Sequence, residues 1–109
     1  MKIIDKPWGN EVWLVTNNKN YSLKILNIKK GKRLSLQYHT IKDESLYLDD
    51  GIAHITIDNK EFDIGPGAVL EIPPGTLHRF EAIIDCRFIE VSTPELEDVI
   101  RIEDDYNRN

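Results

Sequence analysis

The chain has 109 residues, of which 40% are hydrophobic and 30% are charged, and its formal net charge is -5. This length suits one domain, and the acidic balance argues against nucleic-acid binding and against membrane-surface binding, which both need a basic face. The longest apolar run is the four residues Val12 to Val15, too short to span a bilayer. The N-terminus lacks the apolar region of a secretory signal, and the single cysteine, Cys86, cannot form an internal disulfide. We therefore expect a cytoplasmic protein that folds as one domain without cross-links.

Hydrophobic and polar residues alternate in a series of short runs, which is the period of β-strands. In chain order these runs lie at residues 21–25, 34–39, 46–48, 55–57, 80–82 and 88–91. Segments rich in Gly, Pro, Asn and Asp separate them, often at intervals near ten residues. This spacing predicts an all-β sandwich or barrel. Only Pro94 to Ile102 has features of a short helical turn, because acidic residues follow Pro94 as they do at helix N-termini.

Four polar side chains of the kinds that bind metals have a suggestive spacing: Gln37, His39, Glu44 and His78. Gln37 and His39 are two apart on a predicted strand, so both point to the same face. Glu44 lies across a short turn, on a second strand that could lie beside the first, and His78 comes 34 residues later. A mixed nitrogen and oxygen set suits zinc, iron, manganese, cobalt or nickel. His54 has no partner in this pattern, and a lone histidine is more often a surface residue than a ligand.

The spacing of these residues resembles the two motifs of the cupin superfamily. The first motif, G-x5-H-x-H-x4-E-x6-G, matches Gly31, Gln37, His39, Glu44 and Gly51, with Gln in place of the first His. The second, G-x5-P-x-G-x2-H-x3-N, matches Gly67, Pro73, Gly75 and His78, with Ala82 where Asn is usual. A short hairpin around Asp58 would link the two motifs. The resemblance implies that residues 1–109 form a single cupin domain, a double-stranded β-helix or jelly-roll barrel.

Within that superfamily the chain resembles the C-terminal domain of type II phosphomannose isomerases, which are also called mannose-6-phosphate isomerases. The glutamine variant of the first motif, the segment Lys6 to Gly9 and the ending 98–108 carry this similarity. In bacteria this domain is commonly fused to a mannose-1-phosphate guanylyltransferase. The family often has H-H-R between its first metal His and Glu, where this chain has Thr40, Ile41 and Lys42.

The resemblance implies a metal-dependent aldose–ketose isomerase that acts on a sugar phosphate. A divalent metal, with zinc as first choice and manganese, iron, cobalt or nickel as alternatives, would bind Gln37, His39, Glu44 and His78. Lys24 and Arg101 are the predicted catalytic residues, Lys24 as the candidate general base and Arg101 as a charge partner for the phosphate. Lys42 is predicted to bind the substrate phosphate.

Two other functions remain open from the sequence. A metal-containing cupin could bind a sugar or nucleotide-sugar without converting it, which the altered H-H-R stretch favours. An iron-dependent oxygenase could use the two histidines and the carboxylate of His39, Glu44 and His78. By resemblance to other cupins, which pair through a sheet edge or an exchanged N-terminal strand, we also expect a homodimer.

Overall fold

A computed structural model of the chain describes residues 1–108 and contains only β-strands as regular elements. The strands are β1 (Lys2–Lys6), β2 (Gly9–Val15), β3 (Ser22–Ile28), β4 (Leu36–Tyr38), β5 (Glu44–Asp50), β6 (Ala53–Ile57), β7 (Lys60–Ile64), β8 (Val69–Ile72), β9 (His78–Ala82), β10 (Cys86–Ser92) and β11 (Ile100–Glu103). The all-β prediction is therefore confirmed. No helix in residues 1–108 is long and apolar enough to cross a membrane.

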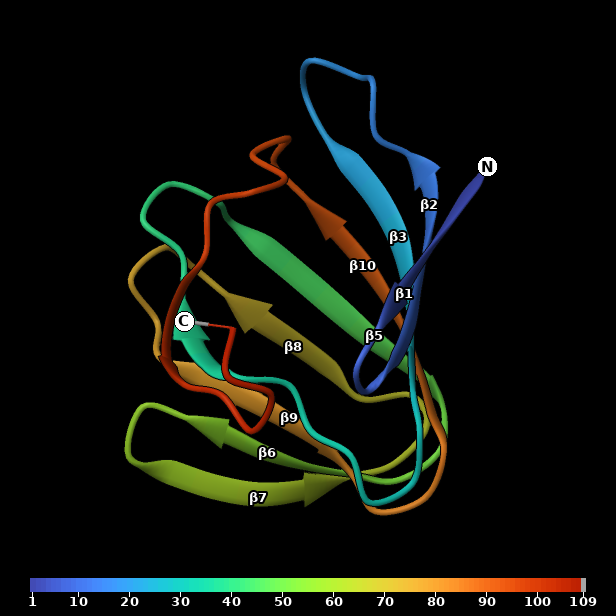
Figure 1. The fold of residues 1–109 in the computed structure, drawn as a ribbon, viewed down its shortest axis with the longest axis vertical. Helices are drawn as coiled ribbons and strands as arrows, with labels where there is room; N and C mark the ends of the chain where they lie inside the picture. The colour runs from blue at the N-terminus through green and yellow to red at the C-terminus, as the bar shows by residue number, and fades with distance from the viewer. Residues whose placement is uncertain (109) are drawn as a thin grey trace.

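The strands form two antiparallel sheets that face one another (Figure 1). One sheet has six strands in the order β1-β2-β3-β10-β5-β8, and the other has five in the order β11-β4-β9-β6-β7. Neighbouring strands come from distant parts of the chain, as where β3 pairs with β10 and β4 pairs with β9. This interleaving is the jelly-roll arrangement, although the sheets pack as a sandwich and are not closed into one hydrogen-bonded barrel.

The space between the sheets holds both an apolar core and a cavity beside it. Phe80 of β9 and Phe88 of β10 stack across this space with ring centroids 5.3 Å apart, and both are essentially inaccessible to solvent. The buried apolar side chains around them are Trp8, Leu26, Ile28, Leu34, Leu46, Leu48, Ala53, Ile55, Leu70, Ile72, Ala82 and Cys86. Because burial of such side chains is the main stabilising contribution to folding, the core holds the two sheets together and fixes the cavity beside it.

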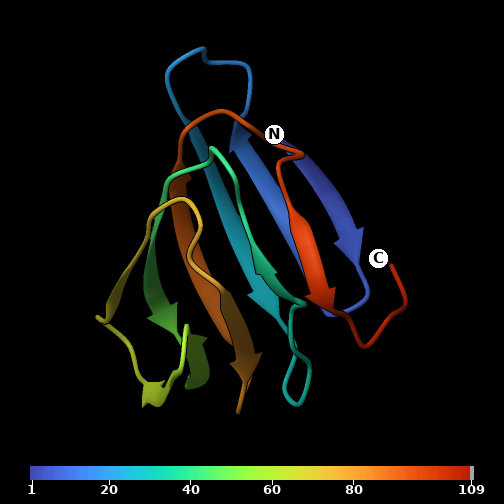
Figure 2. The same ribbon diagram turned by 90° about the vertical axis from the view of Figure 1, so that its left-hand side faces the viewer.

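The predicted helical turn over Pro94 to Ile102 is wrong. This segment makes a turn and then forms β11, which pairs with β4 at the end of the five-stranded sheet (Figure 2). A free strand edge offers unpaired backbone groups, and pairing with it satisfies the donors and acceptors of an incoming segment. That tertiary partner outweighs the local helix signal, and it places Arg101 directly opposite Gln37.

The hairpin predicted between the two cupin-like motifs is present as β6 and β7. Its turn includes Asp58, whose φ of 52° lies in the left-handed region that Asp tolerates better than most residues. His54 lies on β6, where its Nδ1 is 2.6 Å from Asp63 Oδ1 and its Nε2 is 3.0 Å from Glu61 Oε1. The histidine thus belongs to a surface ion-pair cluster and lies outside the metal-ligand group.

The two carboxylates raise the pKa of His54, with the hydrogen bond to Glu61 as the largest cause. A pKa that is higher in the folded state stabilises the fold fully below the unfolded pKa, and this contribution is lost as the pH rises through the folded pKa. We expect NMR titration of the His54 ring to give a pKa above the ordinary value. Relative to His54→Gln, the wild type should lose a small part of its unfolding free energy on going from acidic to alkaline pH. Parallel stability profiles of the two proteins would contradict this.

Candidate functional site

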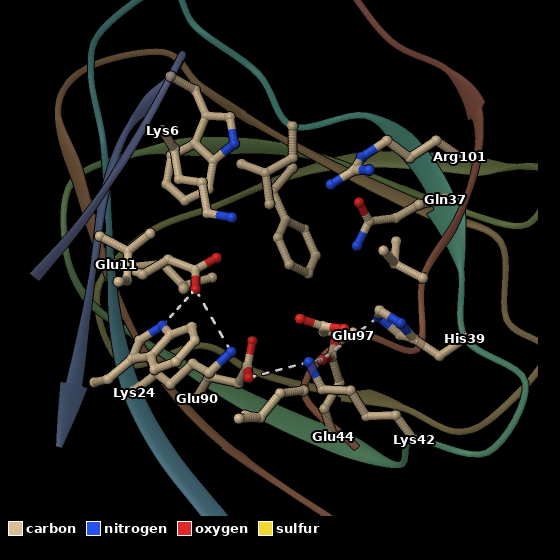
Figure 3. Close-up of a pocket in the computed structure, with 18 of the residues that line it drawn as sticks. Lys6, Glu11, Lys24, Gln37, His39, Lys42, Glu44, Glu90, Glu97 and Arg101 are labelled. Atoms are coloured by element: carbon tan, nitrogen blue, oxygen red, sulfur yellow. Dashed lines mark hydrogen bonds and ion pairs between the residues drawn. The ribbon is translucent and has the colours of Figure 1, made fainter. Parts of the chain in front are cut away.

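A cavity of about 400 Å³ opens between the two sheets, next to the apolar core. Side chains of both sheets and of the segment before β11 line it, as Figure 3 shows. One end carries His39 and Glu44, and Lys6 and Arg101 lie around the other end (Figure 3). The cavity therefore combines candidate metal ligands with positively charged groups.

His39, Glu44 and His78 come together although they lie on three different segments. His39 follows β4, Glu44 begins β5 and His78 begins β9, and all three side chains are buried. One carboxylate oxygen of Glu44 lies 3.7 Å from His39 Nε2 and the other lies 3.5 Å from His78 Nε2. One ligand atom of each residue lies within 4.8 Å of the others. The expectation that the strand of Glu44 lies beside that of Gln37 and His39 is wrong, because β5 belongs to the facing sheet.

Hydrogen bonds orient both imidazole rings toward the centre of this group. His39 Nδ1 lies 2.5 Å from the carbonyl oxygen of Asp98, and His78 Nδ1 lies 2.8 Å from that of Thr76. A carbonyl only accepts, so each Nδ1 carries a proton, and in the neutral ring each Nε2 then presents its lone pair. Both Nε2 atoms are buried and have no hydrogen-bond partner within residues 1–108. Two orphaned acceptors aimed at a shared carboxylate fit a bound divalent cation.

The electrostatics of the group also suit a cation. Burial would raise the pKa of Glu44, but the neighbouring His39 ring and the charge of Lys42 outweigh it and lower the pKa to about 2. Burial lowers the pKa of His78, which keeps that ring neutral. Burial opposes the charged form of His39 as well, but the neighbouring Glu44 outweighs it and raises the pKa of that ring. An ionised carboxylate between imidazoles is the charge distribution that a divalent metal stabilises.

Gln37 lines the same cavity but holds a different position from the other three predicted ligands. It pairs with His78 in the register of β4 and β9, and its Oε1 accepts a hydrogen bond of 2.5 Å from the Ser35 hydroxyl. An amide oxygen has two lone pairs, so this bond leaves one for a metal. Metal binding by Gln37 stays a prediction.

The three predicted cationic residues all line the cavity. Lys24 Nζ lies 3.5 Å from Glu11 Oε1 and 4.9 Å from the centre of the Trp13 ring. Arg101 presents a buried Nε without a hydrogen-bond partner in residues 1–108. Lys42 is buried between two carboxylates. Their catalytic and binding roles remain predictions.

Several charged groups of the cavity were not expected from the sequence, and Glu90 is the most buried of them. A signal existed, since Glu90 is in phase with the core residue Phe88 on an alternating strand and must share its inward face. Lys6 and Glu11 gave no comparable signal, because they reach the cavity only through the pairing of β1 and β2 with β3.

Asp98 holds the loop that carries His39. Its carboxylate accepts hydrogen bonds from the backbone amides of Thr40, Ile41 and Lys42 and from the Thr40 hydroxyl, at distances of 2.6 to 3.1 Å. These bonds, with Thr40 as the largest cause, lower the pKa of Asp98. Because its carbonyl also binds His39, Asp98 connects the segment before β11 to the candidate metal ligands. This gives a physical role to the first residue of the family-like ending.

Comparison with protein families tests the family resemblance that the sequence motifs indicate. Residues 2–104 match the family model of the mannose-6-phosphate isomerase C-terminal domain. The chain belongs to this family. Similar curated proteins include the mannose-1-phosphate guanylyltransferase ManC of Salmonella typhimurium and the alginate biosynthesis protein AlgA of Pseudomonas aeruginosa, each 32% identical over 108 residues. The alignments cover 94% of this chain and 22% of either relative, so the chain spans about a fifth of their length.

Solved structures show the fold of this family member. KdgF from Halomonas sp. superposes with a TM-score of 0.78 at 16% identity, and the match covers 90% of both chains. The oxalate decarboxylase of Lactobacillus farciminis gives a TM-score of 0.79 at 20% identity over 93% of this chain and 33% of its own. The cupin domain of Schizosaccharomyces pombe Cnp3 gives 0.72 at 13% identity, covering 77% of this chain and 63% of that one. The predicted cupin fold is therefore confirmed.

Proposed function

We propose that this domain is a metal-dependent aldose–ketose isomerase that acts on a sugar phosphate. The observation that carries the proposal is the pair of unpartnered Nε2 atoms of His39 and His78, aimed at ionised Glu44 inside a cavity with cationic groups. Family membership supports the sugar-phosphate class. A divalent ion, with zinc as first choice, would supply Lewis-acid polarisation of the substrate's carbonyl and hydroxyl oxygens.

The cations away from the metal ligands support an anionic substrate. Arg101 carries an unpartnered buried Nε, and Lys6 has no ion pair within residues 1–108 (Figure 3). The phosphate would lie against these two groups, and the sugar carbons would reach toward His39 and Glu44. Lys42 is less suited to this task than predicted, because it is already paired with two carboxylates.

Exchange between aldose and ketose requires a group that moves a proton between C1 and C2. Lys24 remains the proposed base, since its contacts with Glu11 and Trp13 hold it in place at the cavity wall. Glu90 is directly opposite Lys24 in the register of β3 and β10, and burial raises the pKa of its carboxyl. To act as the base, Lys24 must first give up its own ammonium proton, and the Glu90 carboxylate opposite it would accept that proton, so that the neutral amine can take the proton from the substrate.

The test is a turnover assay with mannose 6-phosphate and fructose 6-phosphate on the metal-loaded domain. We expect interconversion, and we expect Arg101→Met to raise KM at least about tenfold while its metal content stays at the wild-type level. No interconversion by a metal-loaded wild type would overturn the isomerase. Retained sugar or nucleotide-sugar binding would then support the non-catalytic alternative, and iron-dependent oxygen uptake would support the oxygenase.

The location, oligomeric state and partners that the sequence predicts belong to the same proposal. We infer a cytoplasmic homodimer whose partners are small sugar phosphates or nucleotide-sugars. The curated relatives, named as guanylyltransferases and a biosynthesis protein, support the sugar chemistry. Light scattering would measure the subunit number.

A further inference from the structure

We propose that Lys42 is a built-in counter-cation of the metal site, a role that rests on the proposed metal binding. When no divalent ion is bound, the Lys42 ammonium neutralises the charge of Glu44. When an ion binds Glu44, the ammonium stays in the cavity as the ion-pair partner of Glu90. Lys42 therefore opposes metal binding and lowers the affinity of the site, while it stabilises the metal-free protein.

The position of Lys42 carries this inference. Its Nζ lies 3.1 Å from Glu44 Oε2 and 3.3 Å from Glu90 Oε2, and the side chain is only 8% exposed. The backbone amide of Lys42 is held by Asp98, so the chain enters the cavity from a fixed point. A long side chain on a fixed base can shift its ammonium between two neighbouring oxygens with little rearrangement.

Two buried carboxylates explain why a cation is needed there. Glu44 and Glu90 lie on the inward faces of the adjacent strands β5 and β10, and they are only 4% and 5% exposed. A buried carboxylate without a partner is strongly destabilising, and two close together also repel each other. The pKa of Glu90 is raised by burial first and by Glu44 second, while Lys42 opposes both effects. Lys42 is thus the group that allows these two residues to be buried together.

Glu90 itself is outside the candidate ligand set, which within the described residues is His39, Glu44 and His78. Metal binding by Glu90 therefore does not explain why this residue is ion-paired with Lys42. A divalent ion bound to Glu44 would repel the Lys42 ammonium, which lies 3.1 Å from the Glu44 carboxylate. Glu90 offers the ammonium a second partner inside the cavity, so Lys42 can leave Glu44 without becoming unpaired.

The test is titration with Zn²⁺, and with Co²⁺ for its absorption spectrum, of wild type, Lys42→Met and Glu90→Gln. We expect Lys42→Met to bind at least tenfold tighter than wild type, because the competing charge is gone. Glu90→Gln should bind at least several-fold weaker, because Lys42 then has only Glu44. Lys24→Met is the matched control: it removes a lysine of the same cavity that contacts Glu11, and its affinity should stay within threefold of wild type.

Thermal melts give a second readout that does not depend on catalysis. Metal-free Lys42→Met should melt below wild type, and Zn²⁺ should raise its Tm by a larger amount. If Lys42→Met does not fold without metal, the double variant Lys42→Met/Glu90→Gln removes the repulsion, and it should still bind Zn²⁺ tighter than Glu90→Gln.

The outcomes separate this role from the metal site itself. Metal binding by wild type with unchanged or weaker binding by Lys42→Met would overturn the counter-cation. Binding by Lys42→Met alone would support the counter-cation and overturn a resident metal in the wild type. Binding by neither protein would overturn the metal site and this inference with it.

Discussion

Replacing His78 with Ala is expected to reduce the affinity for a divalent metal by at least about a hundredfold and to leave the purified domain without stoichiometric metal. The change removes one of the two proposed imidazole ligands, and loss even of groups that merely orient ligands lowers metal affinity about ten- to a hundredfold. Metal analysis after gel filtration, with Zn²⁺ titration, measures the effect.

Two further measurements make this result specific. His54→Ala is the matched control, because His54 is the remaining histidine and lies in the surface cluster with Glu61 and Asp63. Its metal content should equal that of the wild type. His78 is fully buried against Phe80, so a circular dichroism spectrum must show that His78→Ala is folded. Full metal occupancy in folded His78→Ala would rule out the proposed site.

Replacing Gly51 with Ala is expected to destabilise the fold by about 2–5 kcal/mol. The φ of Gly51 is +102°, and an added Cβ would lie 2.3 Å from the carbonyl oxygen of Asp85 and 2.8 Å from Cys86 Sγ. The left-handed backbone costs about 1–2 kcal/mol for a residue with a Cβ, and overpacking adds roughly 1–3 kcal/mol. Because a domain of this size has only about 5–15 kcal/mol of stability, urea unfolding should show a large shift of the midpoint.

Gly67 provides the comparison, since it has the same kind of backbone but open space around it. Its φ is +96°, and a Cβ added there would have no neighbouring atom within 4 Å. Gly67→Ala should therefore cost only the backbone strain, about 1–2 kcal/mol. Equal destabilisation of the two variants would show that the close approach to Asp85 has no energetic consequence.

The alternation of residues 21–25 shows what a local pattern can and cannot predict. It correctly indicates a strand, β3, but its apolar members Leu23 and Ile25 lie on the outer face of the six-stranded sheet and Lys24 points inward. On that outer face, apolar residues line up across all six strands: Ile3, Val12, Ile25, Ile89, Tyr47 and Val69. Because these side chains shield one another, apolar character alone does not identify the core-facing side.

Some features of the candidate site could likewise be predicted from the sequence, and others could not. The spacing of the cupin-like motifs predicted that His39, Glu44 and His78 belong together, and the structure places one ligand atom of each within 4.8 Å of the others. The sequence could not show that β4 and β5 lie in opposite sheets, nor that Lys42 would be buried between Glu44 and Glu90. The contact of Lys42 with Glu90 joins distant parts of the chain, and no local spacing reports it.

The acidic charge, the β-strands, the cupin family and the candidate metal-ligand types were all determined by the sequence itself, because turn residues, alternation and motif spacing are local properties. The tertiary structure decided which strand faces surround the cavity, which lysines are buried, and that residues 100–103 form a strand beside β4. The physical reason is that burial and strand pairing depend on the whole packed molecule. A net charge of -5 does not predict a cavity in which Lys42 lies within ion-pair distance of two buried carboxylates.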